Sequence, residues 1–161
     1  MPKEDVALGI TTSVGFLFET TRTIAQMTFQ GTFEKYKHLT FILPHSGGAI
    51  PFIYPRWDMF YFSRSPSHPL RKLPNPPSHY LKSHYYDTAL SYYPSSLKCT
   101  AELAGVRHIL FGTDFPYTID FRAKETIERI ENCGFSKEER EKIYFKNALR
   151  LFPKIKEKHQ R

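Results

Sequence analysis

Residues 108–111 are the feature that most constrains the fold of this chain. The run from His108 to Phe111 is almost purely apolar, and it ends abruptly at Gly112-Thr113-Asp114-Phe115-Pro116. A short apolar run of this kind is typical of a strand that is buried on both faces of a parallel sheet. The run therefore predicts a strand of a parallel α/β sheet, followed by a loop.

The rest of the chain alternates strand and helix patterns around this run. Short β-favouring segments predict two further strands, at 39–43 and 84–87. Apolar spacing and capping residues predict helices at 16–33, 51–62, 94–103, 124–131 and 137–151, the last capped by Ser136. Five prolines predict a long loop at 63–79, and the basic residues of 153–161 predict a solvated helix end or a frayed terminus. This order predicts a single α/β domain with about three parallel strands and flanking helices.

Composition excludes several classes of protein. The 161 residues are 40% hydrophobic, enough for one buried core. Cys99 and Cys133 have neither metal-type nor disulfide-framework spacing, so we expect a reducing, cytoplasmic environment. Glu4 and Asp5 stand where a signal peptide would be positive, and no apolar run reaches the roughly 18 residues of a membrane span. The formal charge is +7, but the basic residues are scattered and no nucleic-acid-binding motif occurs, so we do not expect nucleic-acid binding.

Two of the loops carry reactive side chains. His45 follows the first predicted strand and Asp114 follows the third. Parallel α/β folds place their chemistry in loops at the carboxyl ends of strands. A single histidine or a single Asp after glycine is more often structural, but the shared placement of these two favours a joint site.

Five motifs occur in an order that narrows the interpretation. They are Phe16-Leu17-Phe18-Glu19-Thr20-Thr21, His45-Ser46-Gly47-Gly48-Ala49-Ile50-Pro51 with Arg56 beyond it, Tyr85-Tyr86-Asp87, Gly112-Thr113-Asp114-Phe115-Pro116 and Asn147-Ala148. Together they resemble motifs of the amidohydrolase-related (amidohydrolase 2) family, which includes aminocarboxymuconate-semialdehyde decarboxylase and the resorcylate-type decarboxylases. The resemblance extends over residues 13–152, within one partial domain at 1–161.

This resemblance implies a fold and a set of site residues. The family has a distorted (β/α)₈ barrel of the TIM type, of which this chain would be the carboxyl-terminal part. Its divalent metal, zinc or manganese, is held by an H-x-H pair after the first strand, a histidine after the fifth and an aspartate after the eighth. By resemblance, Asp114 is a metal ligand, His45 is the catalytic histidine and Arg56 binds the carboxylate of the substrate.

Structural interpretations stay open beside these roles. Asp114 could cap its loop, and Arg56 could be a surface cation in an aromatic helix. Glu19 and Asp87 are more often structural than active-site neighbours. Two aromatic residues near Asp114, Phe115 and Tyr117, are expected to line the pocket or the core.

The implied reaction is non-oxidative decarboxylation, or hydrolysis, of a small aromatic or unsaturated carboxylic acid. A complete barrel needs about 250 residues, and no histidine precedes His38, so the three histidine ligands are absent from the sequence. We therefore expect the isolated chain to be inactive. Three strands would leave open sheet edges, which predicts a homo-oligomer or docking to a complementary chain. The alternative is a non-enzymatic remnant or interaction module of the same fold.

Overall fold

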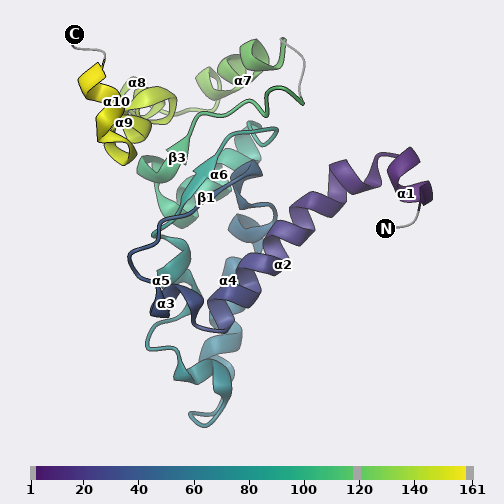
Figure 1. Ribbon diagram of the computed structural model, residues 1–161, viewed down its shortest axis with the longest axis vertical. Helices are drawn as coiled ribbons and strands as arrows, with labels where there is room; N and C mark the ends of the chain where they lie inside the picture. Colours follow the sequence, from purple (N-terminus) through teal and green to yellow (C-terminus); the bar gives the residue numbers. More distant parts are fainter. Residues whose placement is uncertain (1–2, 118–120, 159–161) are drawn as a thin grey trace.

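Three short parallel strands form the centre of the molecule. The computed structural model describes residues 3–117 and 121–158, and its sheet has the order β1 (Ile42–Leu43), β2 (Tyr85–Asp87) and β3 (Ile109–Leu110). Ile42 is aligned with Tyr85, and Tyr86 with Ile109. The predicted parallel sheet with flanking helices is confirmed, with strands shorter than predicted (Figure 1).

The amino-terminal helices differ from the prediction. Helix α1 (Lys3–Ala7) and a π-type segment (Thr11–Gly15) precede α2 (Phe16–Phe29), and α3 (Thr32–Lys35) follows it. The predicted helix at 16–33 is wrong at its end, because Gly31 adopts a φ of 76° and separates α2 from α3. In Figure 1 the outer part of α2 reaches away from the sheet and carries α1 at its far end.

The proline-rich segment contains more regular structure than its composition predicts. Helix α4 (Ile50–Ser63) is followed by a 3₁₀ turn (Pro69–Lys72) and by α5 (Pro77–Leu81). Proline at the first helical position lacks only an N–H that would be unpaired there anyway, so Pro77 can start α5. The predicted loop at 63–79 therefore differs from the structure in two places, the 3₁₀ turn and its last residues, which belong to α5. The segment also packs inward, since Leu73 is buried and its carbonyl accepts a 2.9 Å hydrogen bond from the Tyr61 hydroxyl.

The helices of the second half follow the prediction closely. Helix α6 (Pro94–Ala104) ends at Gly105, and α7 spans Phe121–Glu131. The predicted last helix consists of α8 (Lys137–Glu141), a π-type segment (Lys142–Lys146) and α9 (Asn147–Leu151). Its predicted cap is confirmed, because Ser136 and Glu139 form a reciprocal capping box. In the tail, α10 (Pro153–Lys158) follows, and residues 159–161 lie outside the described part.

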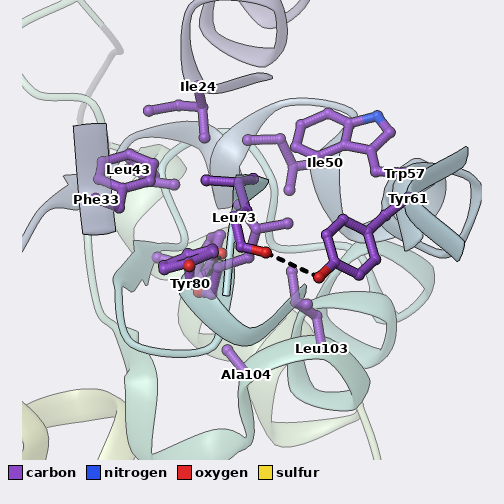
Figure 2. Close-up of a cluster of buried hydrophobic side chains, with 12 residues drawn as sticks. Ile24, Phe33, Leu43, Ile50, Trp57, Tyr61, Leu73, Tyr80, Leu103 and Ala104 are labelled. Atoms are coloured by element: carbon purple, nitrogen blue, oxygen red, sulfur yellow. Dashed lines mark hydrogen bonds between the residues drawn. The ribbon is translucent and has the colours of Figure 1, made fainter. Parts of the chain in front are cut away.

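Two hydrophobic clusters hold the layers together. Figure 2 shows the larger cluster, where side chains from α2, α3 and α4 meet those of β1, α5 and the end of α6. Its buried members are Ile24, Phe33, Leu43, Ile50, Trp57, Tyr61, Leu73, Tyr80, Leu81, Tyr86, Leu103 and Ala104. The smaller cluster joins α6 and β3 to the carboxyl-terminal helices through Leu97, Ile109, Ile130, Cys133 and Ile143.

A side-chain amide fixes the carboxyl-terminal helices to the sheet. Asn147 is buried, and its Nδ2 donates 2.8 Å hydrogen bonds to the carbonyls of Val106 and Ile109. These bonds satisfy backbone groups where the chain enters β3. The Asn147-Ala148 motif therefore has a structural role here. Within the described residues, no helix is long and apolar enough to cross a membrane.

Candidate active site

Polar side chains follow all three strands at the carboxyl-terminal end of the sheet. His45 comes after β1, Asp87 is the last residue of β2 and Asp114 lies in the loop after β3. Because the strands are parallel and paired in register, their carboxyl ends meet at the same end of the sheet. The sheet therefore brings these three residues to one side of the molecule.

His45 is held in a defined orientation by groups from β2 and the loop after it. Its backbone N–H donates a 2.7 Å hydrogen bond to Asp87 Oδ1, and its ring Nδ1 lies 2.8 Å from the carbonyl oxygen of Ala89. A carbonyl can only accept, so Nδ1 carries the proton in this contact and Nε2 is left with the free lone pair in a neutral ring. The backbone of His45 has a φ of 53°, a left-handed conformation that turns the chain sharply after Pro44.

Asp87 organises the loop rather than lying free in the site. Its Oδ1 also accepts a 3.1 Å hydrogen bond from the Ala89 N–H. Burial raises the pKa of the Asp87 carboxyl; the backbone amides of His45 and Ala89 and the charge of His45 oppose this rise, and the charge of Asp114 adds to it. Asp87 is thus electrostatically coupled to both predicted site residues. Sequence reasoning treated it as structural, and its place at the end of a strand was the one signal of this role.

The ends of β2 and β3 are joined directly. Thr88 Oγ1 donates a 2.9 Å hydrogen bond to the Gly112 carbonyl and accepts one of 3.0 Å from the Gly112 N–H. A Cβ at Gly112 would lie 3.4 Å from the Cβ of Asp87, in ordinary van der Waals contact. This reciprocal pair fixes where the Asp114 loop leaves the sheet.

The His45 loop is also fastened to α2. Gly48 has a φ of 67°, and a Cβ there would collide with the carbonyl oxygen of Leu17. The buried Thr21 hydroxyl donates to that same carbonyl at 2.7 Å and accepts a 2.9 Å hydrogen bond from the Ala49 N–H. The glycines of the His45 motif thus serve a close approach between loop and helix.

A groove runs between α2 and the outer edge of β1 and ends at His45. Its volume is about 560 Å³. Its lining residues are Phe16, Glu19, Thr20, Thr23, Ile24 and Met27 from α2, with Phe41, Ile42, Leu43, Pro44 and His45. β1 is an edge strand, because it pairs with β2 alone in the described sheet. The groove therefore combines apolar side chains with an unpaired strand edge.

The other predicted site residues lie outside this groove. Asp114 has a φ of 65°, and its carbonyl accepts a 2.9 Å hydrogen bond from the Tyr117 N–H. Arg56 is exposed on α4, with its guanidinium carbon 5.6 Å from the centre of the Phe60 ring. Phe115 and Tyr117 are 76% and 90% exposed, so the expectation that they belong to the core is wrong, and neither lines this groove.

The described residues of this chain do not form a complete metal site. Among residues 3–117 and 121–158, no group of three or more His, Cys, Asp or Glu side chains could hold an ion. Zinc usually takes three or four protein ligands. Asp87 Oδ1 is already occupied by two backbone amides, and both cysteines are free thiols.

Comparisons with known proteins agree with the motifs. The sequence profile of the amidohydrolase family matches residues 3–154. The chain is 29% identical over 140 residues to 6-methylsalicylic acid decarboxylase from Penicillium expansum, which covers 86% of this chain and 42% of that protein. It is 30% identical over 139 residues to 2-amino-3-carboxymuconate-6-semialdehyde decarboxylase from Dictyostelium discoideum, covering 84% of this chain and 37% of that protein.

Solved structures of this family share the same arrangement of strands and helices. One is a dihydroxybenzoic acid decarboxylase from Polaromonas with bound manganese and the inhibitor 2-nitroresorcinol. It superposes with a TM-score of 0.73 at 25% identity, covering 95% of this chain and 47% of that one. The resemblance and the partial-barrel fold predicted from the motifs are confirmed. The chain spans less than half the length of the relatives it matches.

Proposed function

Because the chain belongs to the amidohydrolase family, we propose that it forms the carboxyl-terminal part of the active site of a non-oxidative decarboxylase acting on a small aromatic or unsaturated carboxylic acid. The Penicillium and Dictyostelium relatives are decarboxylases by name, which supports the reaction class. The observation that carries the proposal is the orientation of His45, whose Nδ1 contact with the Ala89 carbonyl leaves Nε2 free.

His45 suits the proton transfer that this reaction needs. Loss of CO₂ breaks a carbon–carbon bond and leaves its electron pair on the ring or vinyl carbon, which then has to receive a proton. A protonated His45 can give the Nε2 proton to that carbon, and the neutral ring then regains a proton from water. The Ala89 carbonyl holds the ring in the tautomer that this transfer requires.

Asp114 is proposed as one ligand of a divalent metal, zinc or manganese. The manganese in the Polaromonas structure supports a divalent ion, and a carboxylate is a suitable hard ligand. The described residues contain no group of three ligands, and the remaining ligands are proposed to come from another polypeptide segment. Activity is therefore proposed for the combination of this chain with such a segment.

Arg56 is proposed to bind a substrate carboxylate, for which its two-pronged guanidinium is suited. It is exposed on α4 and outside the groove, so it can serve this role only where another surface closes over α4. Phe52, Met59 and Phe62 on the same helix are also exposed, at 79%, 56% and 65%. Their exposure supports a homo-oligomer or a docked complementary chain.

Complementation tests this proposal directly. We would co-express the chain with the part of the Penicillium expansum enzyme that it does not match, then measure metal content by elemental analysis and CO₂ release from 6-methylsalicylate. We expect D114N to lower the metal content, and H45N to keep the metal but lower the rate by about 100-fold or more. Asparagine tolerates the left-handed backbone at position 45, so H45N tests the ring itself.

The matched control is H79Q, which changes an exposed histidine on α5. We expect it to leave both metal content and rate unchanged. A complex that turns over equally fast with H45N, or binds equal metal with D114N, would remove the corresponding role.

The second candidate is a non-enzymatic interaction module of the same fold. The absence of a three-ligand group from the described residues, together with the open groove beside β1, favours it. A complemented complex that is stable but holds no metal and releases no CO₂ would support this alternative. Both candidates agree with a cytoplasmic location, which we propose from the two free cysteines.

A further inference from the structure

Two histidines lie at the amino ends of the strands, at the opposite end of the sheet from His45. His84 immediately precedes β2, and His108 precedes β3. His84 is only 2% exposed, and neither of its ring nitrogens has a hydrogen-bond partner; the same holds for Nδ1 of His108. Buried polar groups without partners are rare and costly, so this pair calls for an explanation.

Aromatic rings enclose His84. The Phe33 ring of α3 lies 4.4 Å from it between centroids, at 65° to its plane. The Phe41 ring lies 5.4 Å away, at 72°. In this edge-to-face geometry a neutral imidazole N–H can point towards a ring face, which replaces part of a lost hydrogen bond. The enclosure suits a neutral ring and offers a charged one no acceptor.

The charges around the pair are mainly positive. The charge of His108 lowers the pKa of His84, and the charges of Arg107 and Arg150 lower the pKa of His108. His108 also forms a hydrogen bond with the backbone of Lys82. Arg150 is held at the Arg107 carbonyl at 2.6 Å. The titratable and charged groups of the neighbouring elements are Glu34 and Lys35 on α3, Tyr36, Lys37 and His38 in the 36–41 segment, His79, Tyr80 and Lys82 around α5, and Tyr85 on β2.

The one carboxylate in that set is already engaged. Glu34 is paired with Lys37 and accepts a 2.9 Å hydrogen bond from the Tyr80 hydroxyl. In the described part of the chain, no ion pair within 4.0 Å joins a carboxylate to either histidine. A proton arriving at His84 would therefore create a buried cation beside other cations.

We propose that His84 and His108 form an acid-sensitive latch, which releases α3 and the 36–41 segment from the amino end of β2 when the surroundings become mildly acidic. Phe33 and Phe41 close the latch by packing on neutral His84, and hydration of the protonated ring requires them to move away. The latch lies at the opposite end of the sheet from His45, so it does not depend on the proposed catalytic function.

The direction of the pH effect follows from burial. Burial lowers the pKa of His84 to about 4, and the charge of His108 adds to this; burial also lowers the pKa of His108. A hydrated His84 in the open state has an ordinary pKa of about 6.5. Between these values the open state binds more protons than the closed state, so closure weakens as pH falls from about 6.5 towards 4.

Hydrogen–deuterium exchange of the full chain, read by mass spectrometry and corrected for the intrinsic effect of pH, tests the latch. We expect the protection of residues 32–41 to fall by up to about tenfold per pH unit between pH 6 and pH 4.5, while residues 137–151 keep theirs. The variant H84F fills the aromatic enclosure without a titratable group and should remove this pH dependence. H79Q, at an exposed histidine, should retain it.

Two results would overturn the latch. One is the same pH dependence at 32–41 in H84F as in the unaltered chain, and the other is loss of protection at 32–41 and 137–151 together. If H84F does not fold, NMR titration of the unaltered chain decides. The His84 ring signal should then shift at a pH well below that of free histidine added as a reference, and a shift at the same pH would refute the proposal.

Discussion

Gly48 and Thr21 show how single residues set the position of the proposed catalytic loop. A side chain at Gly48 would occupy the place of the Leu17 carbonyl, and Thr21 bonds both to that carbonyl and to the Ala49 N–H. The two residues lie 27 positions apart in the sequence but act on one contact between α2 and the His45 loop. This contact can be tested at each side.

For the glycine, G48A is expected to lower the free energy of unfolding more than G134A. Both positions have a positive φ, for which the left-handed helical conformation costs a side chain about 1–2 kcal/mol. Gly48 also has a ψ of −126°, outside that conformation, so an alanine is strained more strongly there. A Cβ at Gly134 meets nothing within 4 Å, whereas one at Gly48 meets backbone. We expect urea unfolding to show a further loss of about 1–3 kcal/mol for G48A. Equal losses would mean that the close approach is relieved by movement of α2.

For the threonine, T21V has a matched control in T28V. Both residues are buried in α2, and both hydroxyls donate to a carbonyl one turn back, at 2.7 Å. Only Thr21 also accepts a bond from outside the helix, so T21V leaves the Ala49 N–H without its partner. We expect T21V to lose about 1–3 kcal/mol and T28V no more than about 1 kcal/mol in the same unfolding measurement. A larger loss in T28V would contradict this assignment.

At this scale the sequence identifies residues but not their partners. His45 and Asp114 could be proposed from their motifs, because each follows a strand pattern. The Asp87 and Ala89 groups that orient His45 lie 42 and 44 residues away, and no local pattern marks that contact. The exposure of Phe115 and Tyr117 was equally hidden, since an aromatic residue beside a site motif suggests burial.

Helix boundaries were predictable where the apolar periodicity and the capping residues agree. They were less predictable where a single glycine or proline determines the boundary. Helix α8 begins directly after its predicted cap Ser136, because its capping residues adjoin an apolar pattern. The break at Gly31 and the start of α5 at Pro77 were missed, because glycine and proline are compatible with several local structures. The packing of Leu73 then stabilises a segment whose composition predicts a loop.

The capping box gives a prediction for a whole helix. S136A removes the acceptor of the Glu139 N–H and is expected to lower the free energy of unfolding by about 0.5–2 kcal/mol. S63A, an exposed serine at the end of α4, should change it by less than about 0.5 kcal/mol. Thermal unfolding followed by circular dichroism would compare the two, and indistinguishable curves would show that α8 does not depend on its cap.

On the scale of the molecule, the sheet has an open edge beside an apolar groove. Ile42 of β1 is 43% exposed, next to the groove formed with α2. Unpaired edges of this kind favour association with another chain, and a lysine on the edge opposes it. The sequence predicted open edges from the number of strands, but the groove follows from the position of α2, which no local pattern fixes.

We expect I42K to weaken self-association of the purified chain. I127K is the matched control, because Ile127 on α7 is 44% exposed and is not among the groove-lining residues. Sedimentation velocity over a range of concentrations should show a smaller associated fraction for I42K and an unchanged one for I127K. If I127K lowers the associated fraction as much as I42K does, association does not depend on the β1 edge.

The hydrogen bond between Thr21 and Ala49 connects α2 directly to the His45 loop. One side of this helix lines the groove, and Thr21 of the same helix accepts a hydrogen bond from the loop that carries His45. A polypeptide that settles in the groove and displaces α2 would pull on that loop, and would change where the free nitrogen of the imidazole points. Occupancy of the groove and the orientation of His45, the proposed proton donor, would then be linked through the hydroxyl group of Thr21.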